Sequence, residues 1–164
     1  MKSNGIETRA PGSPHDHAQC VDTALDKAEA VCAANGSRMT QTRRRVLELI
    51  WESHRPVKAY DLLDRLSTEG RTVKPPTVYR ALDFLTENGL IHRIEGLNAV
   101  VGCADPGATH PGYFLVCDRC ETVTELSSDA LDELIGAEAA RAGFTIYRQS
   151  VEIFGHCRTC EDAR

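Results

Sequence analysis

The chain has 164 residues, 41% hydrophobic and 26% charged, a composition typical of a globular protein with one ordinary domain or two small ones. No stretch is long and apolar enough to cross a membrane, and the N-terminus lacks the apolar segment of a secretory signal, so we expect a cytoplasmic protein whose seven cysteines are reduced. The net charge of −5 hides an asymmetry: residues 38–93 carry eleven Lys and Arg against seven Asp and Glu, whereas residues 94–164 carry five against twelve, as expected if one segment meets phosphates and another does not.

The N-terminal half predicts a tail and then helices. Residues 1–20, rich in Gly, Pro, Ser and His, are expected to be a mobile tail, and a first helix to run from Asp22 to Ala34, before Asn35-Gly36. Thr40 is typical of a residue that caps a second helix, whose apolar positions at helical spacing are Val46, Leu47, Ile50 and Trp51.

Pro56 separates this helix from a third, which ends at Gly70 and carries Leu62, Leu63 and Leu66 on one face. Residues 74–89 predict a fourth helix, with Pro76 in its first turn and Gly89 at its end. Two short strands, residues 90–94 and 98–103, follow as a hairpin. Helices followed by a hairpin predict a winged helix-turn-helix DNA-binding domain over residues 21–103, with the fourth helix as recognition helix.

The C-terminal part predicts a second, smaller domain. Residues 104–112 contain two Pro-Gly pairs and are expected to be a hinge. Beyond it, residues 113–164 predict an α/β unit with strands at 113–117 and 121–126, a helix at 128–142 and a strand at 144–154. Small units of this kind often pair, so we expect dimerisation here. The predicted fold class is α+β.

Two Cys-x-x-Cys pairs are the strongest chemical signal, and they consist of Cys117, Cys120, Cys157 and Cys160. Four thiolates in two such pairs are typical of a tetrahedral structural zinc site, although an iron–sulfur cluster shares the ligand type. A redox-active pair would be expected near a helix N-terminus, whereas these pairs follow predicted strands. Four unrelated buried cysteines remain the simplest alternative.

A second group of metal-competent side chains comes from both predicted domains and the hinge: His92, Cys103, His110 and Glu125. Two imidazoles, one thiolate and one carboxylate would make a tetrahedral zinc site with no position left for water. Binding there would fix the relative orientation of the domains, as a sensor requires. The alternative is that His92 and Glu125 are ordinary strand residues at the surface.

The basic segment predicts a nucleic-acid interface. Lys74, Thr77, Tyr79 and Arg80 lie at the start of the fourth helix, where Arg can read guanine edges in a major groove. Arg43, Arg44 and Arg45 are expected to contact phosphates. The alternative is a solvated helix face.

Together, the run KPPTVYRALDFL, the wing histidine, CDRC and CRTC resemble the ferric-uptake-regulator (Fur) family, and within it the zinc-uptake-regulator (Zur) branch. The resemblance covers residues 20–160. It implies a homodimeric transcription repressor, not an enzyme, that binds double-stranded A·T-rich palindromic operators when loaded with metal and represses zinc-uptake genes. It also implies two zinc ions per chain: a structural ion on the four cysteines and a regulatory ion on the mixed group. Neither a membrane nor a small-molecule substrate is implied.

The sequence departs from the iron- and peroxide-sensing branches. The segment before the first Cys pair, ATHPGYFLVC, contains one histidine instead of a His-rich stretch, and Cys103 adds a soft ligand that favours zinc over ferrous iron. An iron- or peroxide-responsive regulator, a thiol redox switch and a zinc-stabilised adaptor that binds no DNA remain alternatives. Cys32 is expected in the core, and His15, His17 and Cys20 offer a third place for metal without fixed geometry.

Overall fold

The structure is a computed structural model that describes residues 17–53, 55–70, 73–107 and 111–162. Within these ranges the chain forms two compact units, an N-terminal unit up to residue 107 and a C-terminal unit from residue 111. Among the described helices, none is both long and apolar enough to cross a membrane. The two units are described separately.

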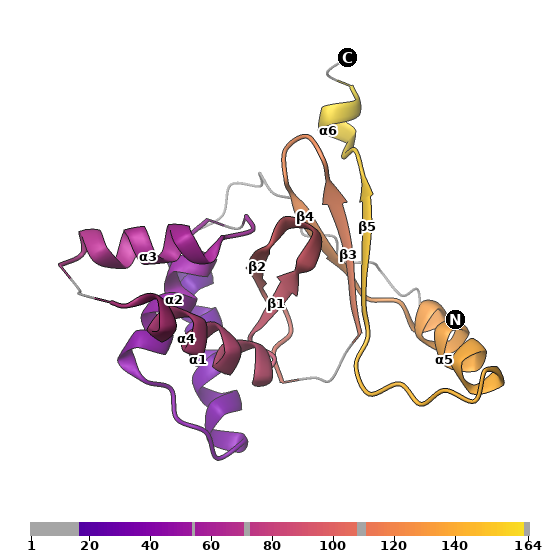
Figure 1. Ribbon diagram of the computed structural model, residues 1–164, viewed down its shortest axis with the longest axis horizontal. Coiled ribbons are helices and arrows are strands. Elements are labelled where there is room, and N and C mark those ends of the chain that lie inside the picture. The colour runs from indigo at the N-terminus through magenta and orange to yellow at the C-terminus, as the bar shows by residue number, and fades with distance from the viewer. Residues whose placement is uncertain (1–16, 54, 71–72, 108–110, 163–164) are drawn as a thin grey trace. The chain divides into compact units, whose positions relative to one another are not determined.

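The N-terminal unit is a winged helix-turn-helix, as predicted (Figure 1). Its helices are α1 (His17–Ala34), α2 (Gln41–Trp51), α3 (Ala59–Thr68) and α4 (Pro75–Glu87). Its wing consists of β1 (Ile91–Ile94), the short helix η1 (Glu95–Leu97) and β2 (Ala99–Gly102). The first helix begins five residues before the predicted start at Asp22, because nothing in residues 17–21 breaks a helix and Ala18 and Gln19 favour one.

The helices of this unit form where their end signals predict. The Thr40 hydroxyl accepts a hydrogen bond from the backbone N–H of Arg43 at 3.4 Å and caps α2. Gly70 and Gly89 take positive φ after α3 and α4, a conformation that glycine adopts without steric cost. The core is built from the apolar faces of all four helices, with Val46, Leu49, Leu62, Leu66, Val78 and Leu85 fully buried.

The wing is an antiparallel hairpin in which Ile91 pairs with Gly102 and Ile94 with Ala99. Asn98 takes the left-handed conformation (φ 49°) that closes the connection. A Cβ atom added to Gly102 would lie 2.5 Å from the Trp51 ring, so the wing packs closely on α2 at a position where only glycine fits.

The C-terminal unit contains β3 (Gly112–Cys117), β4 (Val123–Leu126), α5 (Asp129–Arg141), β5 (Ser150–Gly155) and the one-turn helix α6 (Arg158–Glu161). The sheet order is β4-β3-β5, with β3 antiparallel to β4 and parallel to β5. Figure 1 shows α5 and α6 at opposite ends of this sheet. The order of strands and helix agrees with the prediction, and α6 was not predicted.

The predicted strand over 144–154 is wrong in its first half, because residues 144–149 are not part of the sheet. The ladder begins where Gly112 pairs with Ser150. The first bond of the ladder runs from the Gly112 N–H to the Gln149 carbonyl oxygen at 3.3 Å, so the start of this strand depends on where β3 begins and not on the β-branched and aromatic residues at 144–147. Phe144 and Tyr147 are therefore exposed instead of lying in a strand.

A buried tyrosine attaches α5 to the sheet. The Tyr113 hydroxyl donates to Oδ1 of Asp132 on α5 at 2.7 Å and accepts from Nε2 of Gln149 at 2.5 Å. Burial, together with the Asp132 carboxylate, raises the pKa of Tyr113 above its ordinary value, so the hydroxyl keeps its proton for this bond. The contact orients α5, whose own residues are all at least partly exposed.

Candidate metal centres and nucleic-acid interface

The four cysteines of the Cys-x-x-Cys pairs come together at one end of the C-terminal sheet. Cys117 is the last residue of β3, and Cys120 lies in the following turn. Cys157 immediately precedes α6, and Cys160 lies within that helix. The parallel register sets this meeting, because Cys117 pairs with Gly155, two residues before Cys157. All four sulfur atoms lie within 4.8 Å of one another, and all four residues are free thiols.

The spacing of these sulfurs fits a tetrahedral metal ion. The Sγ atoms of Cys120 and Cys157 are 3.7 Å apart. Four ligands placed at the usual zinc–sulfur distance of about 2.3 Å define a tetrahedron with edges of about 3.8 Å. The cluster therefore has the donor type and the size that zinc requires.

Hydrogen bonds around the cluster join the two Cys-x-x-Cys pairs. The N–H of Cys157 donates to Sγ of Cys117 at 3.3 Å, and the Arg119 guanidinium donates to the Cys160 carbonyl oxygen at 2.6 Å, joining the two pairs. These features were not predicted, since Arg119 is separated from Cys160 by 41 positions. Glu121 takes a positive φ of 55° in the turn after Cys120, which gives the first pair its compact shape.

The four thiols differ in acidity. The hydrogen bond from the Cys157 N–H, with further backbone donors at Cys120 and Arg119, lowers the pKa of Cys117 to about 6. Contacts with the sulfurs of Cys157 and Cys120 raise the pKa of Cys160 to about 12. Cys117 is therefore a thiolate at neutral pH.

Two members of the predicted mixed group lie together on the wing. The N–H of Cys103 donates to the Leu90 carbonyl oxygen at 3.0 Å, which extends the hairpin by one pair beyond β2. His92 and Cys103 are thus diagonal neighbours on one face of the hairpin, with ligand atoms within 4.8 Å of each other. Cys103 is buried at 1% exposure, and His92 is half-buried.

Of the other two predicted members, the structure describes only Glu125. Glu125 belongs to the C-terminal unit, where it lies on β4 opposite Phe114 and is half-buried. His110 lies outside the described residues, as does His15 of the tail. His17 and Cys20 lie on α1, and Cys32 is buried in the helical core as predicted.

The predicted recognition residues are on the exposed side of α4. Lys74 immediately precedes the helix, and Thr77, Tyr79 and Arg80 are exposed in its first two turns. Val78, Leu82 and Leu85 hold the opposite side in the core. This arrangement presents a hydroxyl, a phenol and a guanidinium at the N-terminal end of the helix, where major-groove contacts are made in winged-helix proteins.

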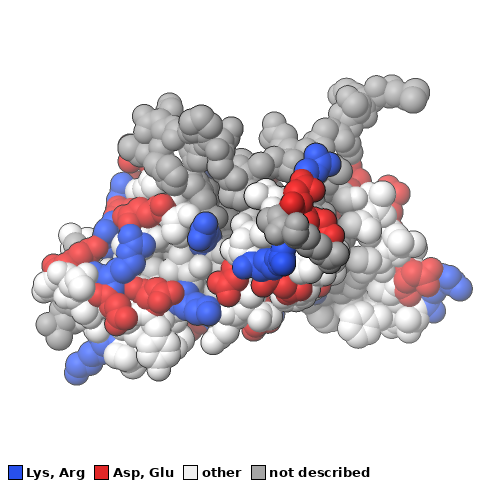
Figure 2. All heavy atoms as spheres, turned by 90° about the horizontal axis from the view of Figure 1, so that it is seen from above, with Lys and Arg blue, Asp and Glu red and all other residues white. Residues whose placement is uncertain are grey.

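The three consecutive arginines of α2 have partners within the chain. Arg43 lies over the Phe84 ring at 3.5 Å from its centroid, Arg44 pairs with Glu29, and Arg45 forms ion pairs with Glu48, Glu52 and Glu69. These carboxylates raise the pKa of Arg45 above its ordinary value. Figure 2 shows Lys and Arg beside Asp and Glu over the helices of this unit (left). Glu48 and Glu52, three and seven residues after Arg45, were a sequence signal for such pairing. Phosphate contacts by these arginines stay a prediction.

Comparisons with known proteins agree on one family. The model of the ferric uptake regulator family matches residues 34–154. The zinc uptake regulation protein of Escherichia coli K12 is 39% identical over 137 residues, covering 83% of this chain and 80% of that protein.

Two solved structures share the fold. A zinc uptake regulator complexed with zinc and DNA has a TM-score of 0.82 at 37% identity, with 87% of this chain and 96% of that chain covered. The crystal structure of holo XcZur has a TM-score of 0.79 at 40% identity, with 86% and 99% covered. The chain therefore belongs to the ferric uptake regulator family, in the branch of the zinc uptake regulators.

Proposed function

We propose that this chain is a zinc-responsive transcriptional repressor that binds A·T-rich palindromic operators as a homodimer when loaded with zinc and represses zinc-uptake genes. The observation that carries the proposal is the 39% identity with a zinc uptake regulation protein across 83% of the chain. A protein with this role acts on DNA in the cytoplasm and is not an enzyme.

The proposal assigns two zinc ions to each chain. The structural ion is held by Cys117, Cys120, Cys157 and Cys160, and the 3.7 Å separation of two of their sulfurs supports this assignment. The regulatory ion is held by His92, Cys103, His110 and Glu125. The placement of His92 and Cys103 on one face of the wing supports the first two of these ligands. A thiolate among them favours zinc over ferrous iron.

The DNA interface is proposed on α4. Arg80 reads base edges and Tyr79 and Thr77 contact bases or backbone, while Lys74 binds phosphate; all four are exposed. The 3.5 Å contact between Arg43 and Phe84 places one arginine of α2 beside α4, which supports a phosphate contact at the edge of the interface.

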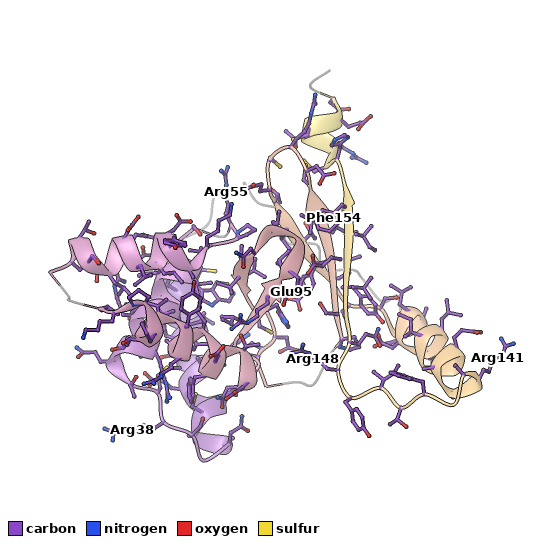
Figure 3. All side chains as sticks on the ribbon, in the orientation of Figure 1. Arg38, Arg55, Glu95, Arg141, Arg148 and Phe154 are labelled. Carbon is purple, nitrogen blue, oxygen red and sulfur yellow. The ribbon has the colours of Figure 1, made fainter. Side chains whose placement is uncertain are left out.

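The dimer is proposed to form through the C-terminal unit. This unit exposes large apolar side chains: Leu134, Phe144, Ile146, Tyr147, Ile153 and Phe154. Figure 3 shows the labelled Phe154 projecting from β5. A water-exposed apolar surface of this extent is typical of a face that a partner covers.

Fluorescence anisotropy with a labelled A·T-rich palindrome tests the proposal. Zinc should raise operator affinity by tens to about a hundredfold, which corresponds to a coupling of ~2–3 kcal/mol. Cys103→Ser should remove most of this enhancement while the protein keeps its fold and one zinc ion. Cys32→Ala, at a buried cysteine of α1, is the matched control and should keep the enhancement. Equal affinity of the wild-type protein with and without zinc would contradict the proposal.

A further inference from the structure

An ion pair joins the recognition helix to the wing. Arg93 on β1 lies 2.6 Å from the Asp83 carboxylate on α4, measured from Nη2 to Oδ1. Both side chains are partly exposed, at 39% and 58%. The backbone between them is a tight turn, in which Gly89 has a positive φ and the N–H of Leu90 donates to the Leu85 carbonyl oxygen at 2.9 Å. The pair thus closes a short loop and restrains the angle between α4 and β1.

The same strand carries a proposed zinc ligand. Successive side chains of a strand point to opposite faces, so Arg93 leaves β1 on the face opposite to that of His92. His92 shares its face with Cys103, as described above. One face of β1 therefore presents the proposed zinc ligands, and the other contacts the recognition helix.

Asp83 is also placed among the proposed DNA contacts. It follows Arg80 by three residues and Tyr79 by four, a spacing that makes these side chains neighbours on a helix surface. A bare carboxylate at this point would repel DNA phosphates, and Arg93 compensates its charge.

We propose that Asp83 and Arg93 are positioning residues that couple the zinc site of the wing to the recognition helix. When His92 is fixed by its ligand, β1 is fixed, and the ion pair holds α4 at the angle that operator binding requires. This inference rests on the proposed function, because it assumes zinc-dependent operator binding.

The test is a double-mutant cycle on operator affinity, measured by anisotropy with zinc and after removal of exchangeable zinc by a mild chelator. The variants are Asp83→Asn, Arg93→Gln and the double substitution. Each should reduce the enhancement by zinc, which is the ratio of zinc-loaded to zinc-depleted affinity, by the same factor of about two- to fivefold. The ratio is the readout because the uncompensated Asp83 carboxylate left by Arg93→Gln repels phosphates in both zinc states. The double variant should lose no more than either single one, since all three break the same pair. Glu87→Gln, at another exposed carboxylate of α4, is the matched control and should behave as wild type.

Three results would overturn the inference. If Arg93 acts only by contacting phosphate, Arg93→Gln weakens binding equally in both zinc states, keeps the wild-type enhancement by zinc and lowers the salt slope by about one. If the pair is irrelevant to coupling, all variants keep the wild-type enhancement by zinc. If the wild-type protein itself shows no enhancement, the proposed function fails and the inference fails with it. The wild-type titration therefore separates the two failures. Thermal unfolding and zinc content should be unchanged in every variant, which excludes a general loss of folding.

Discussion

The four cysteine thiols of the C-terminal cluster differ in pKa. Cys117 accepts a backbone hydrogen bond and has a pKa of about 6, whereas Cys160 is surrounded by other sulfurs and has a pKa of about 12. The spacing of the cysteines predicted that the four side chains lie together, but it contained no sign of this difference in pKa. Acidity depends on which N–H groups point at each sulfur, and the turn geometry and the parallel register of β3 and β5 set those directions.

Acidification should release the structural ion. The pKa of Cys117 in the folded chain lies below the ordinary thiol value of 9.0, so the thiolate contributes stability at high pH, and this contribution is lost as the pH falls through 6. When zinc is bound, protons compete with it for all four thiolates. Cys103→Ser protein, which should hold only the structural ion, is therefore expected to keep its zinc at neutral pH and to release it in acid. A zinc-binding dye in reducing buffer measures the release. Zinc that dissociates already at neutral pH would contradict a permanent structural site.

At the scale of elements, the helices whose ends are set by local sequence signals were predicted correctly. Structure that depends on pairing between distant segments was not. The second, third and fourth helices were predicted from a cap, from helical spacing and from terminal glycines, all within a few residues. The first half of the strand over 144–154 was wrong because its place depends on where β3 begins, more than thirty residues earlier. The intrachain partners of Arg43 and Arg45 were missed for a similar reason, since Phe84 and Glu69 belong to other segments of the chain.

The recognition helix α4 gives a prediction of its own. Arg80→Ala should weaken operator binding about ten- to hundredfold, because a bidentate contact between arginine and guanine contributes about 1–3 kcal/mol. Zinc affinity and thermal stability should stay near wild type, since the side chain is exposed. Arg38→Ala removes an equal charge from the loop before α2, where the labelled side chain points away from the helices (Figure 3), and is the matched control. Anisotropy at fixed salt compares the two. Equal losses would mean that Arg80 contributes only charge.

At the scale of the whole molecule, the division of charge along the chain corresponds to a division of roles. The basic segment lies in the winged helix, and the acidic segment includes the whole C-terminal unit. The acidic unit is poorly suited to DNA and instead exposes the apolar side chains proposed to form the dimer. The sequence predicted this unit but not its surface, because its apolar residues at 144–147 were assigned to the sheet.

The proposed dimer surface predicts the effect of a buried charge. Leu134 is 59% exposed and lines a groove with Ile135, Phe144 and Ile146. Leu134→Glu should shift the protein toward monomer by at least about tenfold in dissociation constant, because it places an unpaired carboxylate in the interface. Ala140→Glu adds the same charge to α5 outside the groove and should leave the dimer intact. Sedimentation equilibrium measures both. A fully dimeric Leu134→Glu variant would place the dimer interface elsewhere.

Each chain is proposed to hold one permanent zinc ion and one exchangeable ion. Elemental analysis of the purified dimer, before and after dialysis against a mild chelator under reducing conditions, tests it most directly. We predict two zinc ions per chain that fall to one while the protein stays a folded dimer. A single zinc ion that dialysis leaves in place would agree with the structural site but would contradict the zinc-sensing function.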